Sequence, residues 1–206
     1  MKVLLFNGSP KPNGCTFTAL SEVARVLGDE GVETEIIQTG NKPVRDCIAC
    51  GGCAGKGKCV FDDEVNEWTE KAKSACGFVF GTPVYYAHPT GRILSLMDRM
   101  FYSAGSAFAQ KPGAVVASAR RAGTTASLDA IVKHLTINQM PVVSSTYWNM
   151  VHGSTPADVK QDAEGMQTMR NLAHNMAWLI KCIEAGKNAG ILPPVADRSA
   201  RTNFIR

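Results

Sequence analysis

The chain has 206 residues, of which 45% are hydrophobic and 19% are charged, and such a chain can bury a core within a single domain. The formal net charge of +4 is scattered and is not interleaved with aromatic residues, which argues against nucleic-acid binding. No apolar run is long enough to suggest a membrane-spanning helix.

The seven cysteines and the N-terminus bear on the cellular compartment. The opening residues, MKVLLFNGSP, lack the length and the small-residue cleavage site of a secretory signal. An odd number of cysteines without such a signal favours a reduced, cytoplasmic protein over a disulfide framework. We therefore expect a cytoplasmic protein with no membrane partner.

Short apolar runs alternate with amphipathic stretches from the first residues onward. The predicted strands lie at 3–6, 32–37, 76–80 and 114–117, and a fifth begins at 141–144. The predicted helices lie at 16–27, from a cap at Asp62 or Asp63 through 71, and at 90–102, 125–135 and 158–185. Asp98 and Arg99 are expected to pair with each other on the third of these helices.

This alternation is typical of an α/β protein with a doubly wound parallel sheet and helices on both faces. Five strands suit the flavodoxin-like order 2-1-3-4-5, in which ligands bind at the carboxyl ends of the strands. We expect one domain over residues 1–190, with a cysteine-rich loop at 45–61. A tail at 191–206, rich in Pro and Arg, is expected to pack on a neighbouring subunit.

The loop after the first predicted strand is dense in hydrogen-bond donors and leads into a helix. It reads NGSPKPNGCTFT and matches neither G-x-G-x-x-G nor a nucleoside-triphosphate loop. A helix N-terminus with nearby hydroxyls favours a phosphate group bound without metal. The predicted donors are Ser9, Lys11, Asn13, Thr16 and Thr18; the alternative is an ordinary capped turn.

Two further loops at the same edge predict a site for a flat ring. The stretch TPVYYAHP places Pro and two tyrosines after a buried strand, although Tyr85 and Tyr86 could serve only packing or a subunit interface. After the fourth strand, Gly123 permits close backbone approach. Arg120 or Arg121 could stabilise negative charge on a ring or bind the phosphate of a dinucleotide, unless both are simply solvated.

Four cysteines lie within thirteen residues, in the run CIACGGCAGKGKC. The thiols of Cys47, Cys50, Cys53 and Cys59 can converge on one cluster, because cubane iron–sulfur clusters take four cysteine ligands. Zinc fits less well, since structural zinc sites usually combine two C-x2-C pairs from separate segments. Free thiols or disulfides remain alternatives. Cys15 is at a helix N-terminus, where a thiol pKa tends to fall.

The segments GSPKPNGCT, CIACGGCAGKGKCVFDD and TPVYYAHPTGRILSLMDR together resemble the iron–sulfur flavoproteins and the related NADPH-dependent FMN reductases. The resemblance implies a flavodoxin-like fold that binds FMN and, through the four cysteines, a [4Fe–4S] cluster. It adds Cys15 to the phosphate loop and places the flavin ring against Pro83, Val84, Tyr85 and Tyr86 and against Ser118, Ala119, Arg120, Arg121 and Gly123. The paired arginines depart from the Gly- and Asn-rich loop of iron–sulfur members, which favours a dedicated pyridine-nucleotide reductase.

The sequence contains no carboxylate pair or Ser/His/Asp set, which suits chemistry carried by a cofactor. We expect an FMN-dependent NAD(P)H oxidoreductase that reduces quinones, flavins, or azo or nitro compounds. The alternative is a non-enzymatic electron carrier that exchanges electrons with ferredoxin, although a net charge of +4 argues against an acidic, flavodoxin-like surface. The family implies a homodimer or homotetramer. The cysteine loop is expected at the same sheet edge as the flavin.

Overall fold

The computed structural model describes residues 1–200, 202 and 204 of the chain. Its sheet has five parallel strands in the order β2-β1-β3-β5-β6, and a sixth short strand, β4, pairs antiparallel with β3. The five parallel strands thus confirm the expected 2-1-3-4-5 order. The strands are β1 (Lys2–Asn7), β2 (Glu33–Gln38), β3 (Gly77–Tyr85), β4 (His88–Pro89), β5 (Gly113–Ala119) and β6 (Met150–His152).

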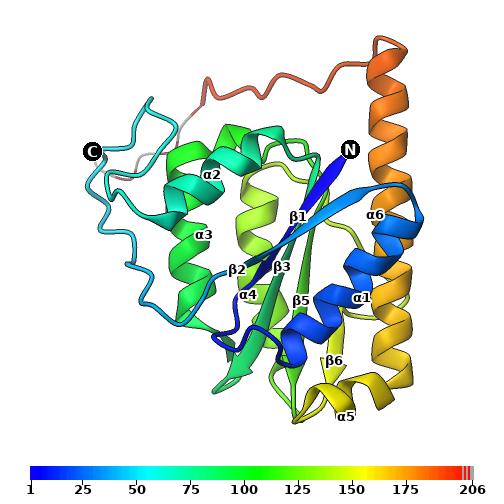
Figure 1. The fold of residues 1–206 in the computed structure, drawn as a ribbon. Helices are drawn as coiled ribbons and strands as arrows, with labels where there is room; N and C mark the ends of the chain where they lie inside the picture. The colour runs from blue at the N-terminus through cyan, green and yellow to red at the C-terminus, as the bar shows by residue number, and fades with distance from the viewer. Residues whose placement is uncertain (201, 203, 205–206) are drawn as a thin grey trace.

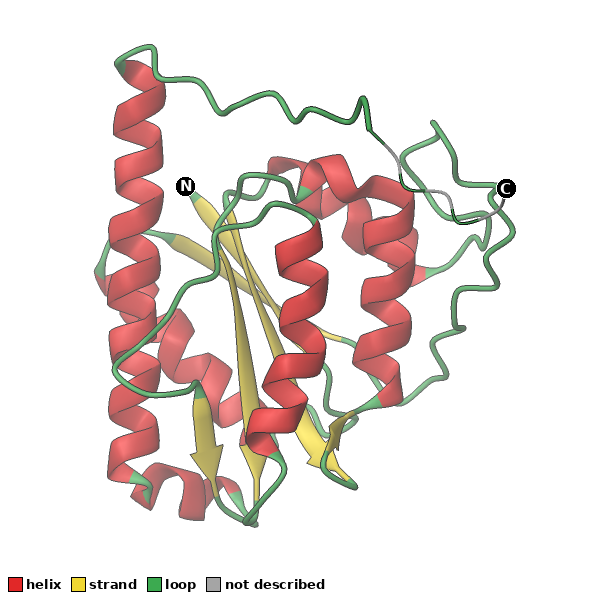
Figure 2. Ribbon diagram, turned by 180° about the vertical axis from the view of Figure 1, so that it is seen from behind, coloured by secondary structure: helices red, strands yellow, loops and turns green. Residues whose placement is uncertain are grey.

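Helices cover both faces of the sheet (Figures 1 and 2). Helices α1 and α6 pack on one face, and α2, α3 and α4 pack on the other. The helices are α1 (Cys15–Asp29), α2 (Glu64–Ser74), α3 (Gly91–Ala104), the 3-10 turn η1 (Gly105–Ala107), α4 (Thr124–Ile137), α5 (Pro156–Gln161) and α6 (Ala163–Asn188). Among the described residues, no helix combines the length and apolarity needed to cross a membrane.

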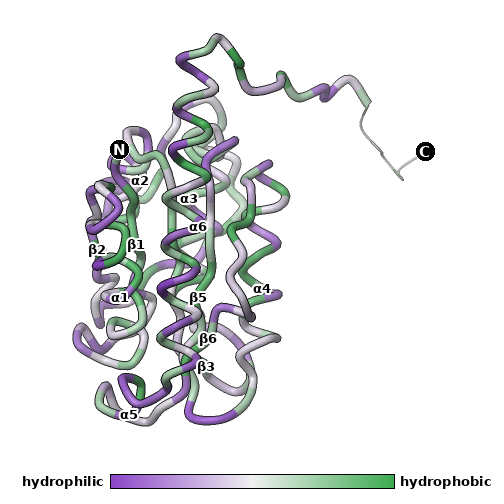
Figure 3. Tube along the Cα trace, turned by 90° about the vertical axis from the view of Figure 1, so that its right-hand side faces the viewer, coloured by the Kyte–Doolittle hydropathy of each residue, from purple (hydrophilic) through white to green (hydrophobic). Residues whose placement is uncertain are grey.

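Alternation along the strands builds two apolar cores, one on each side of the sheet. In β1, Leu4 and Phe6 point into the core under α2, α3 and α4, whereas Val3 and Leu5 point into the core under α1 and α6. Figure 3 shows hydrophobic and hydrophilic segments alternating along α6, as expected for a helix with one buried face. The carboxyl ends of the strands therefore meet at one edge of a rigid, two-sided core.

The fifth strand differs from the prediction. The segment around Val142 forms only an isolated bridge to Gly113, and the regular pairing with β5 begins at Met150. Between them, polar groups bond to α6 instead of β5: Asn175 donates to the carbonyl oxygen of Ser144, and the Ser145 hydroxyl donates to that of Thr168. The chain leaves the sheet here because α6 provides hydrogen-bond partners for Ser144 and Ser145.

The loop expected after β3 is a β-hairpin. Strand β3 continues to Tyr85, and Tyr85 pairs with His88 across a two-residue turn. Tyr86 and Ala87 in this turn have φ of 50° and 61°. A two-residue turn with positive φ at both central residues matches the right-handed twist of the two strands that it joins. Residues other than glycine seldom adopt a positive φ. The hairpin holds the tyrosines beyond the carboxyl edge.

The long C-terminal helical region is divided in two. Helix α5 ends at Gln161, and Asp162 caps α6 by accepting a hydrogen bond of 2.9 Å from the N–H of Gly165. The other carboxylate oxygen of Asp162 accepts a bond of 2.7 Å from the N–H of His152 in β6. The break in the helix therefore ties α6 to the edge strand. Residues 191–200 form no helix or strand.

Candidate functional site

The β1–α1 loop forms a cavity at the carboxyl edge of the sheet. The cavity has a volume of about 280 Å³ and is lined by Lys11, Pro12, Asn13, Gly14, Cys15, Ser154 and Pro156. Gly14, the N-cap of α1, provides no side-chain cap, so the first N–H groups of the helix have no side-chain acceptor. With the positive end of the helix dipole and the Lys11 ammonium nearby, these N–H groups fit a phosphate group.

The predicted donors of this loop divide into two groups. Lys11 and Asn13 are exposed and line the cavity. The hydroxyls of Thr16 and Thr18 instead bond within the protein: Thr16 bonds to the Ser118 hydroxyl of β5 at 2.8 Å, and Thr18 donates to the carbonyl oxygen of Gly14. Ser9 is buried, and its oxygen accepts a bond of 3.2 Å from the N–H of Lys11. The buried hydroxyls thus shape the loop around the exposed donors.

Cys15 behaves differently from the expectation for a helix N-terminus. Burial raises the pKa of its thiol above the ordinary value of 9.0, and this effect exceeds the lowering by its own backbone hydrogen bond. The thiol donates to the carbonyl oxygen of Gly153 at 3.6 Å. Burial therefore outweighs the lowering of the pKa that a helix N-terminus favours, and the thiol links the phosphate loop to the segment after β6.

The two loops predicted to hold a flat ring pack against each other. Gly123 has φ of 91°, and a Cβ atom there would lie 2.6 Å from the Cα of Ala87 in the hairpin turn. Tyr85 and Tyr86 are exposed, and so are Arg120 and Arg121. Pro83 and Val84 are half-buried in β3, whereas Ser118 and Ala119 are buried at the end of β5. The aromatic and cationic side chains of both loops therefore remain free to contact a ligand.

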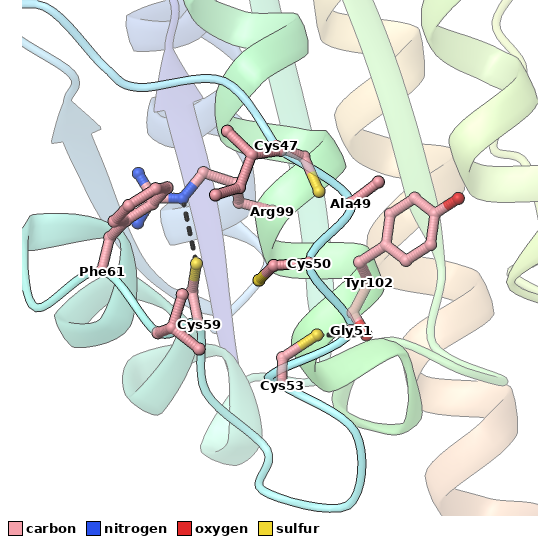
Figure 4. Close-up of a pocket in the computed structure, with 11 residues that line it drawn as sticks. Cys47, Ala49, Cys50, Gly51, Cys53, Cys59, Phe61, Arg99 and Tyr102 are labelled. Atoms are coloured by element: carbon pink, nitrogen blue, oxygen red, sulfur yellow. Dashed lines mark hydrogen bonds between the residues drawn. The ribbon is translucent and has the colours of Figure 1, made fainter.

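The four clustered cysteines line one cavity of about 310 Å³ (Figure 4). Their loop carries positive φ at Ala49, Gly51, Gly55 and Gly57, and these conformations wrap it around the cavity. The other lining residues are Ile48, Ala49, Gly51, Val60, Phe61, Arg99 and Tyr102. All seven cysteines of the chain are free thiols.

The spacing of these thiols bears on what the cavity could hold. No group of three or more His, Cys, Asp or Glu residues in the described part of the chain is placed to hold a metal ion. A tetrahedral zinc ion needs sulfurs about 2.3 Å from one point. A cubane cluster instead takes its four cysteine sulfurs at separate corners of a larger body. The four cysteines that line the shared cavity are the set of side chains that such a cluster takes as ligands.

The cysteine cavity does not lie beside the flavin loops as expected. Arg99 and Tyr102 line it, and both lie well along α3, which starts at Gly91 next to the hairpin. At 1.5 Å per residue, they lie roughly 12 Å and 16 Å from the start of that helix. Figure 1 shows the cysteine loop running beside α2 and α3, away from the edge where β1 ends. Side chains of the helices hold the backbone of this segment: Arg92 and Arg99 of α3 donate to the carbonyl oxygens of Thr39 and Arg45, and Asn66 of α2 bonds to the Cys59 backbone.

The sequence reasoning missed several residues of these sites. Arg99 is fully buried and pairs with Asp63, not with Asp98, which bonds to His134 at 2.8 Å. Ser154 and Pro156 reach the phosphate cavity from a segment far along the chain. The one sequence signal for the buried ion pair was an arginine among the apolar residues that α3 buries. A buried charged side chain requires a buried partner. The predicted cap at Asp63 is confirmed.

Comparisons with known proteins agree with this geometry. Residues 1–155 match the family model described as NADPH-dependent FMN reductase. An iron–sulfur flavoprotein of Methanocaldococcus jannaschii is 34% identical over 192 residues, covering 89% of this chain and 100% of the relative. One of Methanosarcina thermophila is 28% identical over 192 residues, covering 91% and 100%. A solved flavodoxin from the domain Archaea superposes with a TM-score of 0.61 at 14% identity, covering 88% and 99%.

The sheet order and the loops at its carboxyl edge define a flavodoxin-like protein of the flavin-dependent oxidoreductase class. The chain belongs to the NADPH-dependent FMN reductase family. The resemblance drawn from the sequence is thereby confirmed.

Proposed function

We propose that this protein is an FMN-dependent NAD(P)H oxidoreductase that also holds a [4Fe–4S] cluster on Cys47, Cys50, Cys53 and Cys59. The observation that carries the proposal is the pairing of an uncapped helix N-terminus at the flavin edge with four thiols around one cavity. Two relatives that cover most of the chain are named iron–sulfur flavoproteins, which supports it further.

The residues at the carboxyl edge would bind and orient the flavin. Lys11, Asn13 and the first N–H groups of α1 would hold the phosphate. Pro83, Val84 and the two tyrosines would lie against the ring, and Arg120 or Arg121 would face its negative charge or the phosphate of a pyridine nucleotide. When bound, FMN supplies hydride transfer and the cluster supplies single-electron transfer.

Anaerobic purification tests the cofactor content. We expect flavin absorption together with iron and sulfide, and Cys50→Ser should lose the iron while it keeps FMN. Cys182→Ser, which changes an exposed thiol on α6, is the matched control and should keep both. Flavin without iron or sulfide in the unchanged protein would contradict the cluster and leave the flavin assignment intact.

Stopped-flow mixing without oxygen tests the reaction. NADH or NADPH should bleach the flavin, and a quinone, free flavin, azo or nitro acceptor should then restore its colour. The competing function is an electron carrier that exchanges electrons with ferredoxin and has no small-molecule substrate. Bleaching by reduced ferredoxin, with no response to either nicotinamide, would favour that carrier and reject the enzyme.

The location and assembly of the protein follow as further proposals. The described residues include seven cysteines and no disulfide, which suits the reducing cytoplasm. Trp148 and Trp178 are exposed aromatic side chains that could contribute to the subunit contacts of a homodimer or homotetramer. Light scattering after gel filtration tests the assembly, and a monomer at micromolar concentration would contradict it.

A further inference from the structure

Arg99 is a fully buried cation beside the cysteine cavity. Its side chain has no exposed surface, and its two terminal nitrogens donate to the carboxylate of Asp63 at 2.8 Å and 2.7 Å. The remaining nitrogen, Nε, donates to the Sγ of Cys59 at 3.3 Å (Figure 4). A buried guanidinium is retained only where it is paired and bonded, and here a sulfur completes its set of acceptors.

A neutral Cys59 thiol would stabilise the buried Arg99 guanidinium only weakly. The sulfur of a thiol is a weak acceptor, whereas an anionic sulfur accepts a charge-assisted hydrogen bond roughly twice as strong as a neutral one. Asp63 accepts hydrogen bonds from the two terminal nitrogens of Arg99, so the Nε–H is left for a further acceptor. The geometry therefore suits a Cys59 sulfur that carries negative charge.

Cys59 is also the best anchored of the four thiols. Its N–H donates to the side-chain oxygen of Asn66 at 2.8 Å, and the Asn66 amide donates back to the Cys59 carbonyl at 3.0 Å. By contrast, the Cys53 sulfur lies at a longer 3.8 Å from the carbonyl oxygen of Tyr102. Cys59 is thus fixed to α2 by Asn66 and to α3 by Arg99.

We propose that Arg99 is a positioning residue for the cysteine cluster, which holds the Cys59 sulfur in place and raises the reduction potential of the iron bound there. This inference rests on the proposed cluster. Reduction adds negative charge to the cluster, and a fixed cation with an N–H directed at a ligand sulfur favours the reduced form. All four cysteines lie on the same loop, and Arg99 would act on the sulfur of one of them, Cys59.

Two substitutions separate the hydrogen bond from the charge. Arg99→Lys keeps a cation but cannot bond Asp63 through two nitrogens and Cys59 through a third, whereas Arg99→Gln removes the charge as well. Arg45→Gln is the matched control. The Arg45 guanidinium lies 5.1 Å from the centre of the Phe61 ring and that of Arg99 lies 5.2 Å from it, and within the described residues Arg45 donates to no cysteine sulfur.

The experiment is an anaerobic redox titration of the complete protein followed by electron paramagnetic resonance. Both Arg99 variants should show a lower midpoint potential than the unchanged protein, with the larger shift in Arg99→Gln, and Arg45→Gln should differ less than either. FMN content and circular dichroism report whether each variant folds. Loss of iron from Arg99→Gln with FMN retained would also support the positioning role.

Equal potentials in the Arg99 and Arg45 variants would overturn the inference. Loss of FMN together with iron in both Arg99 variants would overturn it too, because Arg99 would then hold the fold and not the cluster. An unchanged protein that contains no iron would instead contradict the proposed function itself. These outcomes are distinguished by the iron and flavin content measured before titration.

Discussion

The hydroxyls of Thr16 on α1 and Ser118 at the end of β5 share a buried hydrogen bond of 2.8 Å. It joins the phosphate loop to the loop expected to face the flavin ring, across 102 residues of sequence. Two parts of one cofactor site are therefore fixed relative to each other by side chains that themselves remain buried.

We expect Thr16→Val to lower the free energy of unfolding by about 1 kcal/mol and to weaken FMN binding roughly fivefold, because it leaves the Ser118 hydroxyl without its partner. Urea unfolding and flavin titration measure the two effects. Thr69→Val is the control: Thr69 is equally buried, but its hydroxyl bonds within α2 to the Val65 carbonyl. Thr69→Val should lower the free energy of unfolding by a similar amount and leave the FMN affinity unchanged. An equal loss of FMN affinity in both variants would show that the Thr16–Ser118 bond has no particular role in FMN binding.

Gly123→Ala should be strongly destabilising. Its φ of 91° disfavours any side chain, and the added Cβ would meet Ala87 at 2.6 Å, so we expect a loss of about 2 kcal/mol or more and weaker FMN binding. The same substitution at Gly28, in the last turn of α1 with no neighbour within 4 Å, should stabilise by about 0.5 kcal/mol. Thermal and urea unfolding compare them, and equal effects at the two glycines would refute the packing argument.

Glu22 should make the free energy of unfolding depend on pH in the acidic range. Hydrogen bonds from Arg25 and then from Arg170 on α6 hold the pKa of its carboxyl below the ordinary value of 4.5. A depressed folded pKa adds stability that is complete above the unfolded pKa and is lost as the pH falls through the folded pKa. Glu22→Gln should therefore cost about 1 kcal/mol at neutral pH, and this difference should vanish in acid.

Urea unfolding from neutral pH down through 4.5 measures this loss, with Glu70→Gln as the control. Glu70 is exposed and, among the described residues, pairs with Lys73 alone in its own helix, so replacing it should change the stability little at any pH. A Glu22 effect that persists unchanged in acid would show that packing, not charge, is involved.

Cys15 should react slowly with alkylating reagents. Only the thiolate is nucleophilic, and burial raises the pKa of the Cys15 thiol, so its rate should still be rising above pH 9.0. The exposed Cys182 is the internal reference and should be modified first. Iodoacetamide labelling across a pH series, read by mass spectrometry, gives both rates. Faster labelling of Cys15 than of Cys182 at neutral pH would restore the low pKa expected from the helix N-terminus.

The sequence predicted those parts of the protein that depend on local periodicity. Alternating apolar runs and amphipathic stretches indicated the parallel sheet, because the spacing of apolar residues in a strand or helix is a local property of the sequence. The strand order came from the flavodoxin-like arrangement that five such strands suit. Asp63 was predictable as a cap for the same reason. The flavin loops followed from the rule that ligands bind at carboxyl ends of parallel strands.

The tertiary structure decided whatever depends on partners far apart in the chain. Polar groups of the segment after Val142 form hydrogen bonds with α6. The cysteine loop lies along α3 instead of at the flavin edge. The tertiary structure also paired Arg99 with Asp63 and Cys59, 36 and 40 residues away, whereas its sequence neighbour Asp98 bonds to His134. Periodicity tells which face of a helix is buried, but the partner of a buried charge is set by the elements that pack against that face.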